Sequence, residues 1–196
     1  MTFTSIRIIA GVAALACTVV VASCSKAQDY SAQTSSTAAT SAQVAVHNAH
    51  DVMFAQMMIP HHQQAVDLAA LVPDRSTNPA VVKLAATISG EQQPEITAMK
   101  ALLVQWDVQP NAASDHGDMP MDGMVDDATM AKLQSLKGAE FDTLWLQSMT
   151  GHHQGAIAMA GGEAAAGQSA DMMKMAENMV TAQQAEIDQM KKLLGG

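Results

Sequence analysis

The sequence predicts an all-α protein, a four-helix bundle built from a duplicated helical hairpin. Alanine, methionine, leucine and glutamine are abundant, whereas the aromatic residues number only three Phe, two Trp and one Tyr. No long stretch alternates β-branched with polar residues, so a sheet has little support. When residues 51–103 are aligned with residues 142–194 without a gap, 18 of the 53 positions are identical. Two hairpins related in this way are expected to pack as a bundle with approximate two-fold symmetry.

The first 23 residues are typical of a secretory signal peptide. Arg7 precedes an apolar run from Ile8 to Val21, which is too short for a comfortable membrane span. The run ends in Val21-Ala22-Ser23-Cys24, which resembles a bacterial lipobox, so we expect cleavage before Cys24 and lipidation of this cysteine. The alternatives are an ordinary signal peptide with a chance cysteine and an uncleaved anchor. All three place the domain outside the cytoplasm, and the lipobox predicts attachment to the membrane through a lipid anchor only.

Residues 24–45 are interpreted as the lipidated cysteine followed by a flexible linker. Ser25 to Gln43 is rich in Ser, Thr, Ala and Gln and has almost no large apolar side chain to bury. Because Cys17 would leave with the signal peptide, no disulfide can form within the mature domain. The net charge of −9 argues against a nucleic-acid partner. Any metal ion bound by the domain must therefore use ligands other than cysteine.

The first repeat contains two predicted helices. The first runs from about Val46 to Leu71 and ends before Val72-Pro73-Asp74, because a residue that precedes proline is biased away from helix. Asn78 is an N-cap residue and Pro79 suits the first helical position, so a second helix is expected to begin there and to continue to about Trp106.

The second repeat follows a loop that is interrupted by glycine and proline. Asp126 or Asp127 is expected to cap a third helical region, with an interruption at Gly138 left open, and this region is expected to end at Gly161-Gly162. Ser169 is expected to cap a fourth helix. The predicted ranges are 46–106 for the first repeat, 107–125 for the loop and 126–194 for the second repeat, within a bundle of residues 46–196.

One motif carries four of the seven histidines: Met58-Ile59-Pro60-His61-His62-Gln63 returns 91 residues later as Met149-Thr150-Gly151-His152-His153-Gln154. Side chains three and four positions apart share one face of a helix, so each methionine lies one turn from both histidines of its copy. Pro60 and Gly151 both weaken a helix at this point, and a kink or a tolerated irregularity is equally compatible with them. The candidate ligands from this motif are Met58, His61 and His62 in one copy and Met149, His152 and His153 in the other.

A carboxylate lies in the expected core face of each second helix, Glu95 in the first repeat and Glu186 in the second. Because a buried charge is costly, each should be compensated by a proton, a cation or hydrogen bonds. Met99 and Met190 follow one turn later and complete the candidate site. Helix geometry predicts that histidines and glutamates of one hairpin differ in level by roughly 6 to 10 Å, which loop geometry can absorb. The spacing permits contact between them without requiring it.

The donor types select the metal. Thioether sulfur is a soft ligand and imidazole a borderline one, so methionine with histidine favours copper, above all Cu(I), with Cu(II) as the other oxidation state to consider. The loop adds His116, Met119, Met121 and Met124, which we interpret as a second copper-capturing segment. Thioethers suit an exported site without cysteines because they need no deprotonation and form no disulfides.

Other histidines and methionines are assigned to packing. Methionine fills irregular cores well, and several helical methionines lie outside the motifs. His47 and His50 have no counterpart in the second repeat and are left out of the site. The methionines assigned to packing are Met159, Met172, Met175 and Met179.

These motifs resemble the family catalogued as domain of unknown function 305. The resemblance rests on Met-x-x-His-His-Gln in the first helix and Gln-x-x-Glu-x-x-x-Met in the second, both repeated, and it covers about Val46 to Leu194. It implies a ferritin-like four-helix bundle of the bacterial periplasm or cell surface that binds copper and helps the cell to sequester, tolerate or handle it. Gly151 in place of Pro60 and Ser148 in place of Met57 imply that the two halves need not bind equally well.

Two other functions compete with copper binding. A di-iron carboxylate oxidase needs Glu from each of two helices and Glu-x-x-His from each of the others, whereas here the histidines are adjacent pairs and no Glu-x-x-His occurs. A structural bundle at the cell surface would use His, Glu and Gln as a neutral buried network and bind no stoichiometric metal. The chain shows no nucleophile with a paired base, no phosphate-binding glycine loop and no basic aromatic surface. We therefore expect no enzymatic activity.

Overall fold

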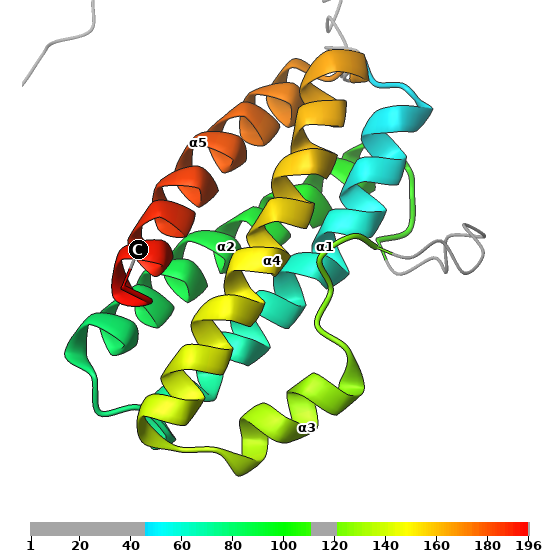
Figure 1. Cartoon of the computed structure of the whole chain (residues 1–196). Coiled ribbons are helices and arrows are strands. Elements are labelled where there is room, and N and C mark those ends of the chain that lie inside the picture. The colour runs from blue at the N-terminus through cyan, green and yellow to red at the C-terminus, as the bar shows by residue number, and fades with distance from the viewer. Residues whose placement is uncertain (1–45, 111–120, 196) are drawn as a thin grey trace, which may run out of the picture. The chain divides into compact units, whose positions relative to one another are not determined.

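The computed structural model describes residues 46–110 and 121–195. Within these ranges the chain forms five α-helices and one short 3₁₀ helix, with no strand, which confirms the predicted all-α class (Figure 1). None of these helices is both long and apolar enough to span a membrane. The predicted signal peptide, lipidation site and linker lie outside the described residues, as do His116 and Met119 of the loop.

The first hairpin consists of α1 (Ala49–Ala70) and α2 (Pro79–Gln105), joined by the 3₁₀ helix η1 (Val72–Asp74). A capping box begins α1, because the side chain of Asn48 accepts from the amide of Asp51 and the side chain of Asp51 accepts from the amide of Asn48. Asn78 caps α2 as predicted. Pro60 lies inside α1 without ending the helix.

The second hairpin consists of α4 (Gly138–Ala166) and α5 (Ala170–Leu193), and a short helix, α3 (Asp127–Ser135), precedes it. Leu136 and Lys137 have extended backbones and separate α3 from α4, and Gly138, the first residue of α4, has a φ of +62° that glycine adopts readily. Ser169 caps α5 as predicted.

The predicted end of the third helical region at Gly161-Gly162 is wrong, since α4 continues to Ala166. Two glycines inside a helix cost about 1 kcal/mol each relative to alanine. Glu163, the next residue, is fully buried, and its carboxylate contacts His50 of α1 at 2.8 Å. This tertiary contact holds the last turn of α4 in the helix.

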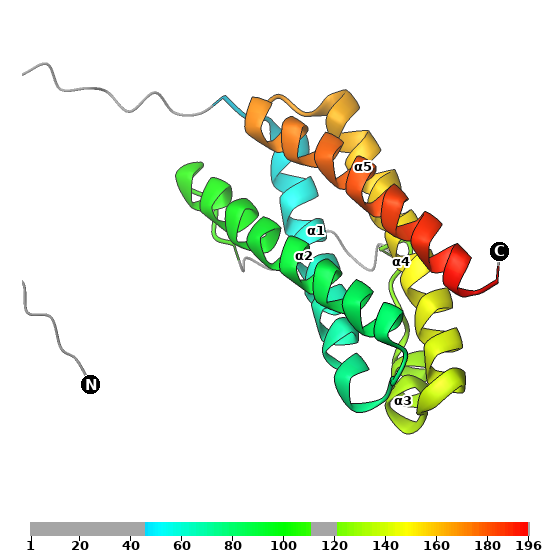
Figure 2. The ribbon, with the colours of Figure 1, turned by 90° about the vertical axis from the view of Figure 1, so that its left-hand side faces the viewer.

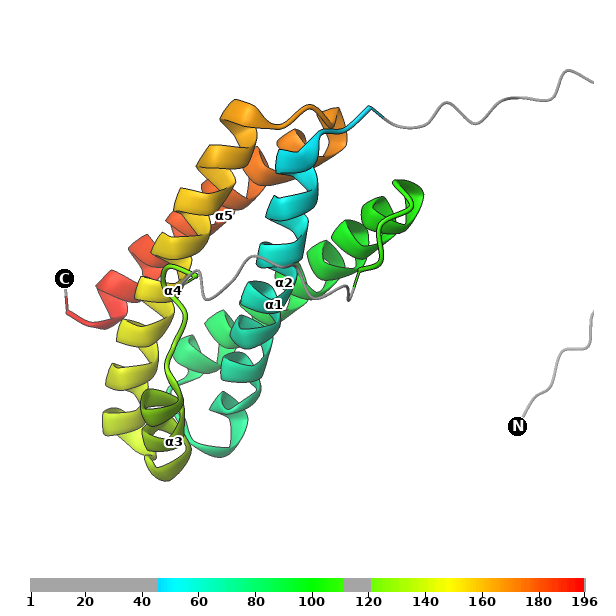
Figure 3. The ribbon, with the colours of Figure 1, turned by 90° about the vertical axis from the view of Figure 1, so that its right-hand side faces the viewer.

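The two hairpins meet through α1 and α4. Within the described residues, α2 packs mainly against α1 and α5 mainly against α4, while α2 and α5 touch over a short stretch (Figures 2 and 3). The short helix α3 packs beside the start of α4 (Figure 1). The α1–α4 interface is therefore the main contact between the two repeats.

The core consists of two apolar clusters separated by a polar layer. The Trp145 cluster combines the end of α1, the start of α2, the start of α4 and the end of α5. The Phe54 cluster combines the opposite end of each of these helices. All four helices pass from one cluster to the other at a group of partly or fully buried polar residues, which we call the histidine layer: His61, His62, Gln92, Glu95, His152, His153, Gln183 and Glu186.

Candidate metal centre

The centre of the histidine layer is a contact between the two repeats. His61 of α1 and His152 of α4 are fully buried, and their ring centroids lie 3.8 Å apart with the planes tilted by 38°. These two residues occupy the same position of the repeat. The two halves therefore do meet at one level, which the sequence left open.

The second histidine of each pair contacts a glutamate of its own hairpin. Nε2 of His62 lies 2.8 Å from Oε2 of Glu95, and Nε2 of His153 lies 2.7 Å from Oε2 of Glu186. Both pairs are separated by 33 residues in the chain, so the arrangement obeys the repeat. The glutamates are compensated by hydrogen bonds, and they hold the rings by their Nε2 atoms, as carboxylates do behind metal-binding histidines.

Several ring nitrogens of the layer have no hydrogen-bond partner among the described residues. Nε2 of His61 lies 3.2 Å from the carbonyl oxygen of Asp122, and a carbonyl only accepts, so Nε2 carries the proton and Nδ1 has a free lone pair. Nδ1 of His62 and Nδ1 of His153 likewise lack a hydrogen-bond partner in the described part of the chain, as do both ring nitrogens of His152. Buried nitrogens are normally satisfied, so the layer contains several candidate donor atoms for a ligand.

Burial keeps the two central rings neutral. It lowers the pKa of His61 to about 4, with the charges of His62 and His153 acting in the same direction. Burial also lowers the pKa of His152 to about 2, and the neighbouring histidines again add to the effect. A neutral imidazole is the form that binds a metal ion, so at neutral pH neither ring must first lose a proton.

Two glutamines of the layer were absent from the predicted site. The side-chain amides of Gln92 and Gln183 are buried, and neither their oxygen nor their nitrogen has a hydrogen-bond partner among the described residues. Both lie in the core stripes of α2 and α5 at the same repeat position. Their duplication inside an apolar stripe was the signal that could have identified them.

The four motif methionines border the layer. Met58 and Met99 are fully buried in the Phe54 cluster, and Met149 and Met190 are fully buried in the Trp145 cluster. The sulfur of Met190 accepts a hydrogen bond from the Thr150 hydroxyl at 3.7 Å. The helical members of the predicted set are thus arranged around one layer, with imidazoles in its middle and thioethers in the clusters on either side.

A segment of the loop covers the layer. The side chain of Gln64 donates to the carbonyl of Val125 and accepts from its amide, both at 2.8 Å. Gly123 has a φ of +86°, and a Cβ atom there would lie 2.7 Å from the carbonyl oxygen of Gly151. A Cβ atom on Gly155 would lie 1.9 Å from the carbonyl oxygen of Asp122. Half-buried Met121 and Met124 belong to the same segment.

Gln64 and Gly155 were not predicted, although they occupy equivalent positions of the two repeats. In the first repeat this position holds the loop by two hydrogen bonds, and in the second it leaves room for the loop backbone. The available signal was that the two repeats differ at this position, directly after the histidine motif. The role of the difference depends on the path of the loop, which cannot be predicted from a helical pattern.

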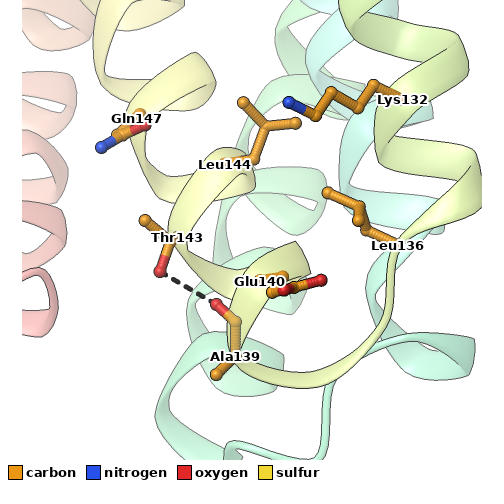
Figure 4. A pocket seen from close by; sticks show the side chains of 7 residues that line it. All are labelled: Lys132, Leu136, Ala139, Glu140, Thr143, Leu144 and Gln147. Carbon is orange, nitrogen blue, oxygen red and sulfur yellow. Dashed lines mark hydrogen bonds between the residues drawn. The ribbon is translucent and has the colours of Figure 1, made fainter.

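A broad pocket of about 560 Å³ lies away from this layer, between α3 and the start of α4 (Figure 4). It is lined by Lys132, Glu140 and other residues of these two helices, and Thr143 in its wall donates to the carbonyl of Ala139 at 2.9 Å. Neither histidine nor methionine lines it. The pocket lacks the donor types of the predicted site and is not a candidate for it.

One kind of metal centre finds no ligand set among residues 46–110 and 121–195. No three His, Cys, Asp or Glu side chains in these ranges are arranged to hold one metal ion. A di-iron carboxylate centre consists of such ligands alone. The described residues therefore give the di-iron alternative no support.

These observations define the class of protein. It is all-helical, consists of two repeated hairpins and has paired histidines buried between the repeats. The chain belongs to the DUF305 family, a domain of unknown function whose sequence model matches residues 51–194. This confirms the predicted resemblance. No curated protein sequence matches the chain.

Solved structures of the family have the same fold. A DUF305 protein of Streptomyces coelicolor, described as a candidate secreted protein, is 34% identical with a TM-score of 0.70, covering 74% of this chain and 92% of its own. A DUF305 fragment of Deinococcus radiodurans is 32% identical with a TM-score of 0.69, covering 76% and 97%. CopM in its Cu(I)-bound form is 31% identical with a TM-score of 0.63, covering 73% and 94%.

Proposed function

We propose that this protein binds copper, principally as Cu(I), in the histidine layer, and that it sequesters or handles copper outside the cytoplasm. The observation that carries the proposal is the buried contact between His61 and His152 at 3.8 Å, with ring nitrogens that have no hydrogen-bond partner among residues 46–110 and 121–195. A structural bundle would be expected to pair these atoms, because an unsatisfied buried polar group costs about 1–3 kcal/mol.

The donor set supports copper over harder cations. Neutral imidazoles lie in the middle of the layer, and Met58, Met99, Met149 and Met190 border it. Imidazole with thioether suits Cu(I), whereas magnesium, calcium and manganese prefer oxygen ligands. Glu95 and Glu186 would orient His62 and His153 rather than bind the ion themselves.

The relatives support the same conclusion. CopM has been crystallised with Cu(I), with Cu(II) and with silver, and silver shares with Cu(I) a preference for soft ligands. The Streptomyces protein is described as a candidate secreted protein, in keeping with the signal sequence at the start of this chain. We further propose that Cys24 carries the lipid anchor and that the protein catalyses no reaction.

The proposal is tested by titrating the purified full-length protein, in detergent and without oxygen, with Cu(I) against a calibrated competing chelator. The variant His61→Asn with His152→Asn removes both central rings and should weaken the tight binding by at least about 100-fold, since even outer-shell partners contribute 10–100-fold. His47→Asn is the matched control, because His47 stacks on Trp106 with centroids 4.6 Å apart, outside the layer. Cu(I) affinity that is unchanged in the double variant would refute the histidine layer as the site.

A further inference from the structure

A groove on the α1–α4 interface carries soft donors that the histidine layer does not use. Its volume is about 220 Å³, and it lies beside the Phe54 cluster. Four of its lining residues carry a metal-binding atom, and the others are Phe54, Ala158 and Gly162. We call it the methionine groove and define it by its donors: His50, Met53, Met57 and Met159.

The arrangement of the donors follows from helix geometry. His50, Met53 and Met57 are spaced by three and four residues, so they share one face of α1. Met159 faces them from α4. All four residues are half-buried and line the groove, and Met159 also packs against the Phe54 cluster.

His50 is held in the way that metal-binding histidines are held. Its Nδ1 lies 2.8 Å from Oε2 of Glu163, whose side chain is fully buried on α4. A carboxylate behind one ring nitrogen fixes the orientation of the ring and leaves the other nitrogen for a metal. Asp51 strengthens the frame, because its carboxylate accepts from the amides of Gln168 and Ser169 and ties α1 to the connection between α4 and α5.

The repeat provides an internal comparison. Ninety-one residues away from His50, Met53 and Met57 stand Phe141, Leu144 and Ser148, and the counterpart of Met159 is Leu68. Phe141 and Leu68 are fully buried in the Trp145 cluster, and Leu144 packs against it. One end of the α1–α4 interface is thus filled with hydrocarbon, while the equivalent end has thioethers and an imidazole around an open groove. Packing alone would account for the first arrangement but not for the second.

We propose that the methionine groove is a second metal site, which binds one soft monovalent ion, Cu(I) in the cell, through Met53, Met57, Met159 and Nε2 of His50. Thioethers on flexible side chains can close around an ion in a groove of this size. The site is separate from the histidine layer, because none of its donors belongs to the layer. It gives Met159 a role beside its packing against the Phe54 cluster, and it adds His50, which the sequence analysis left out of the site.

The test uses Ag(I), a redox-inert probe of soft sites, with full-length protein carrying ¹³C-methyl methionine. As Ag(I) is added, the methyl signals of Met53, Met57 and Met159 should shift together. The variant Met53→Leu with Met57→Leu and Met159→Leu keeps the volume of the groove and should lose one equivalent of bound Ag(I). The matched control replaces three half-buried methionines elsewhere, Met130, Met173 and Met175, by leucine and should bind as much Ag(I) as the parent.

The outcomes separate the two sites. If the groove variant retains every equivalent, or if the three methyl signals of the parent do not move, the methionine groove is not a site. If the groove signals still shift in the His61→Asn, His152→Asn variant, the groove binds independently of the layer, as proposed. Loss of the groove equivalent in that variant would overturn the claim of a separate site. The methyl signals of the parent also decide the question should the triple variant not fold.

Discussion

At the scale of single residues, the donor atoms that the histidine layer can offer depend on which ring nitrogen of each histidine contacts a neighbouring group. Glu95 and Glu186 hold the outer histidines by Nε2, and the carbonyl of Asp122 holds His61 by the same atom. Within the described residues, the Nδ1 atoms of these three rings consequently have no hydrogen-bond partner. In the proposed copper site the glutamates act through the histidines, as positioning residues rather than as ligands.

We predict that Glu95→Gln with Glu186→Gln lowers the affinity for Cu(I) by about 10–100-fold, because an amide orients the imidazole less strongly than a carboxylate. Glu91→Gln is the control: partial desolvation and the nearby charges of Glu186 and Glu95 raise the pKa of this largely exposed side chain, but it hydrogen-bonds neither His62 nor His153. Competition titrations of both proteins with Cu(I) provide the measurement. An equal loss in the two would show that general negative charge, and not orientation, matters.

At the scale of elements, the segment from Met121 to Val125 packs closely against α4 because Gly155 of α4 has no side chain. A Cβ atom on Gly155 would lie 1.9 Å from the carbonyl oxygen of Asp122, whereas a Cβ atom on Gly151, one turn earlier, would meet nothing within 4 Å. Both glycines lie inside the same helix. Only one of them is required by packing, and that one permits the hydrogen bond between the loop and His61.

We predict that Gly155→Ala destabilises the protein by about 1–3 kcal/mol, since the loop backbone must move away from α4. Gly151→Ala should instead be neutral or stabilise by up to about 1 kcal/mol, because alanine is the better helix former. Urea unfolding of the two variants, followed by circular dichroism, measures the difference. Equal stabilities would mean that the loop does not pack against Gly155 in solution.

At the scale of the whole molecule, the folded bundle contains titratable groups whose pKa shifts have opposite effects on the pH dependence of stability. Burial lowers the pKa of His61 and His152 from 6.5 to about 4 and about 2. Burial raises the pKa of Glu163 from 4.5 to about 7, although the contact with His50 acts in the opposite direction. The unfolded chain binds more protons than the folded one at both histidines, and fewer at Glu163.

Acidification from pH 7 to pH 5 should therefore destabilise the metal-free protein. Stability from the two histidines is fully present above pH 6.5 and is lost as the pH falls, by about 2 kcal/mol for each ring at pH 5. Glu163 opposes this by a similar amount because its folded pKa is raised, so the net loss is on the order of 2 kcal/mol. The variant Glu163→Gln removes the opposing contribution and should show about twice the loss. Urea titrations at both pH values test this, and a smaller loss in the variant would contradict it.

The sequence by itself determined most of the helices, the repeat and the candidate donors. Capping residues such as Asn78 and Ser169 act within one turn, and helical periodicity assigned Glu95 and Glu186 to the core without any tertiary information. The identical positions of the two halves identified the histidine motif as a duplicated feature. These properties are local or repeated along the chain, and a linear pattern contains them.

The tertiary structure decided which donors meet. The contact of His61 with His152, the cover over His61 from Asp122, the extension of α4 to Ala166 and the open groove beside Met159 all depend on how the hairpins pack. Repeat symmetry made the two ends of the α1–α4 interface equivalent, yet packing filled one with Phe141 and left the other open. The physical reason is that a helix face fixes direction within one element, whereas level and neighbour are set by close packing between elements.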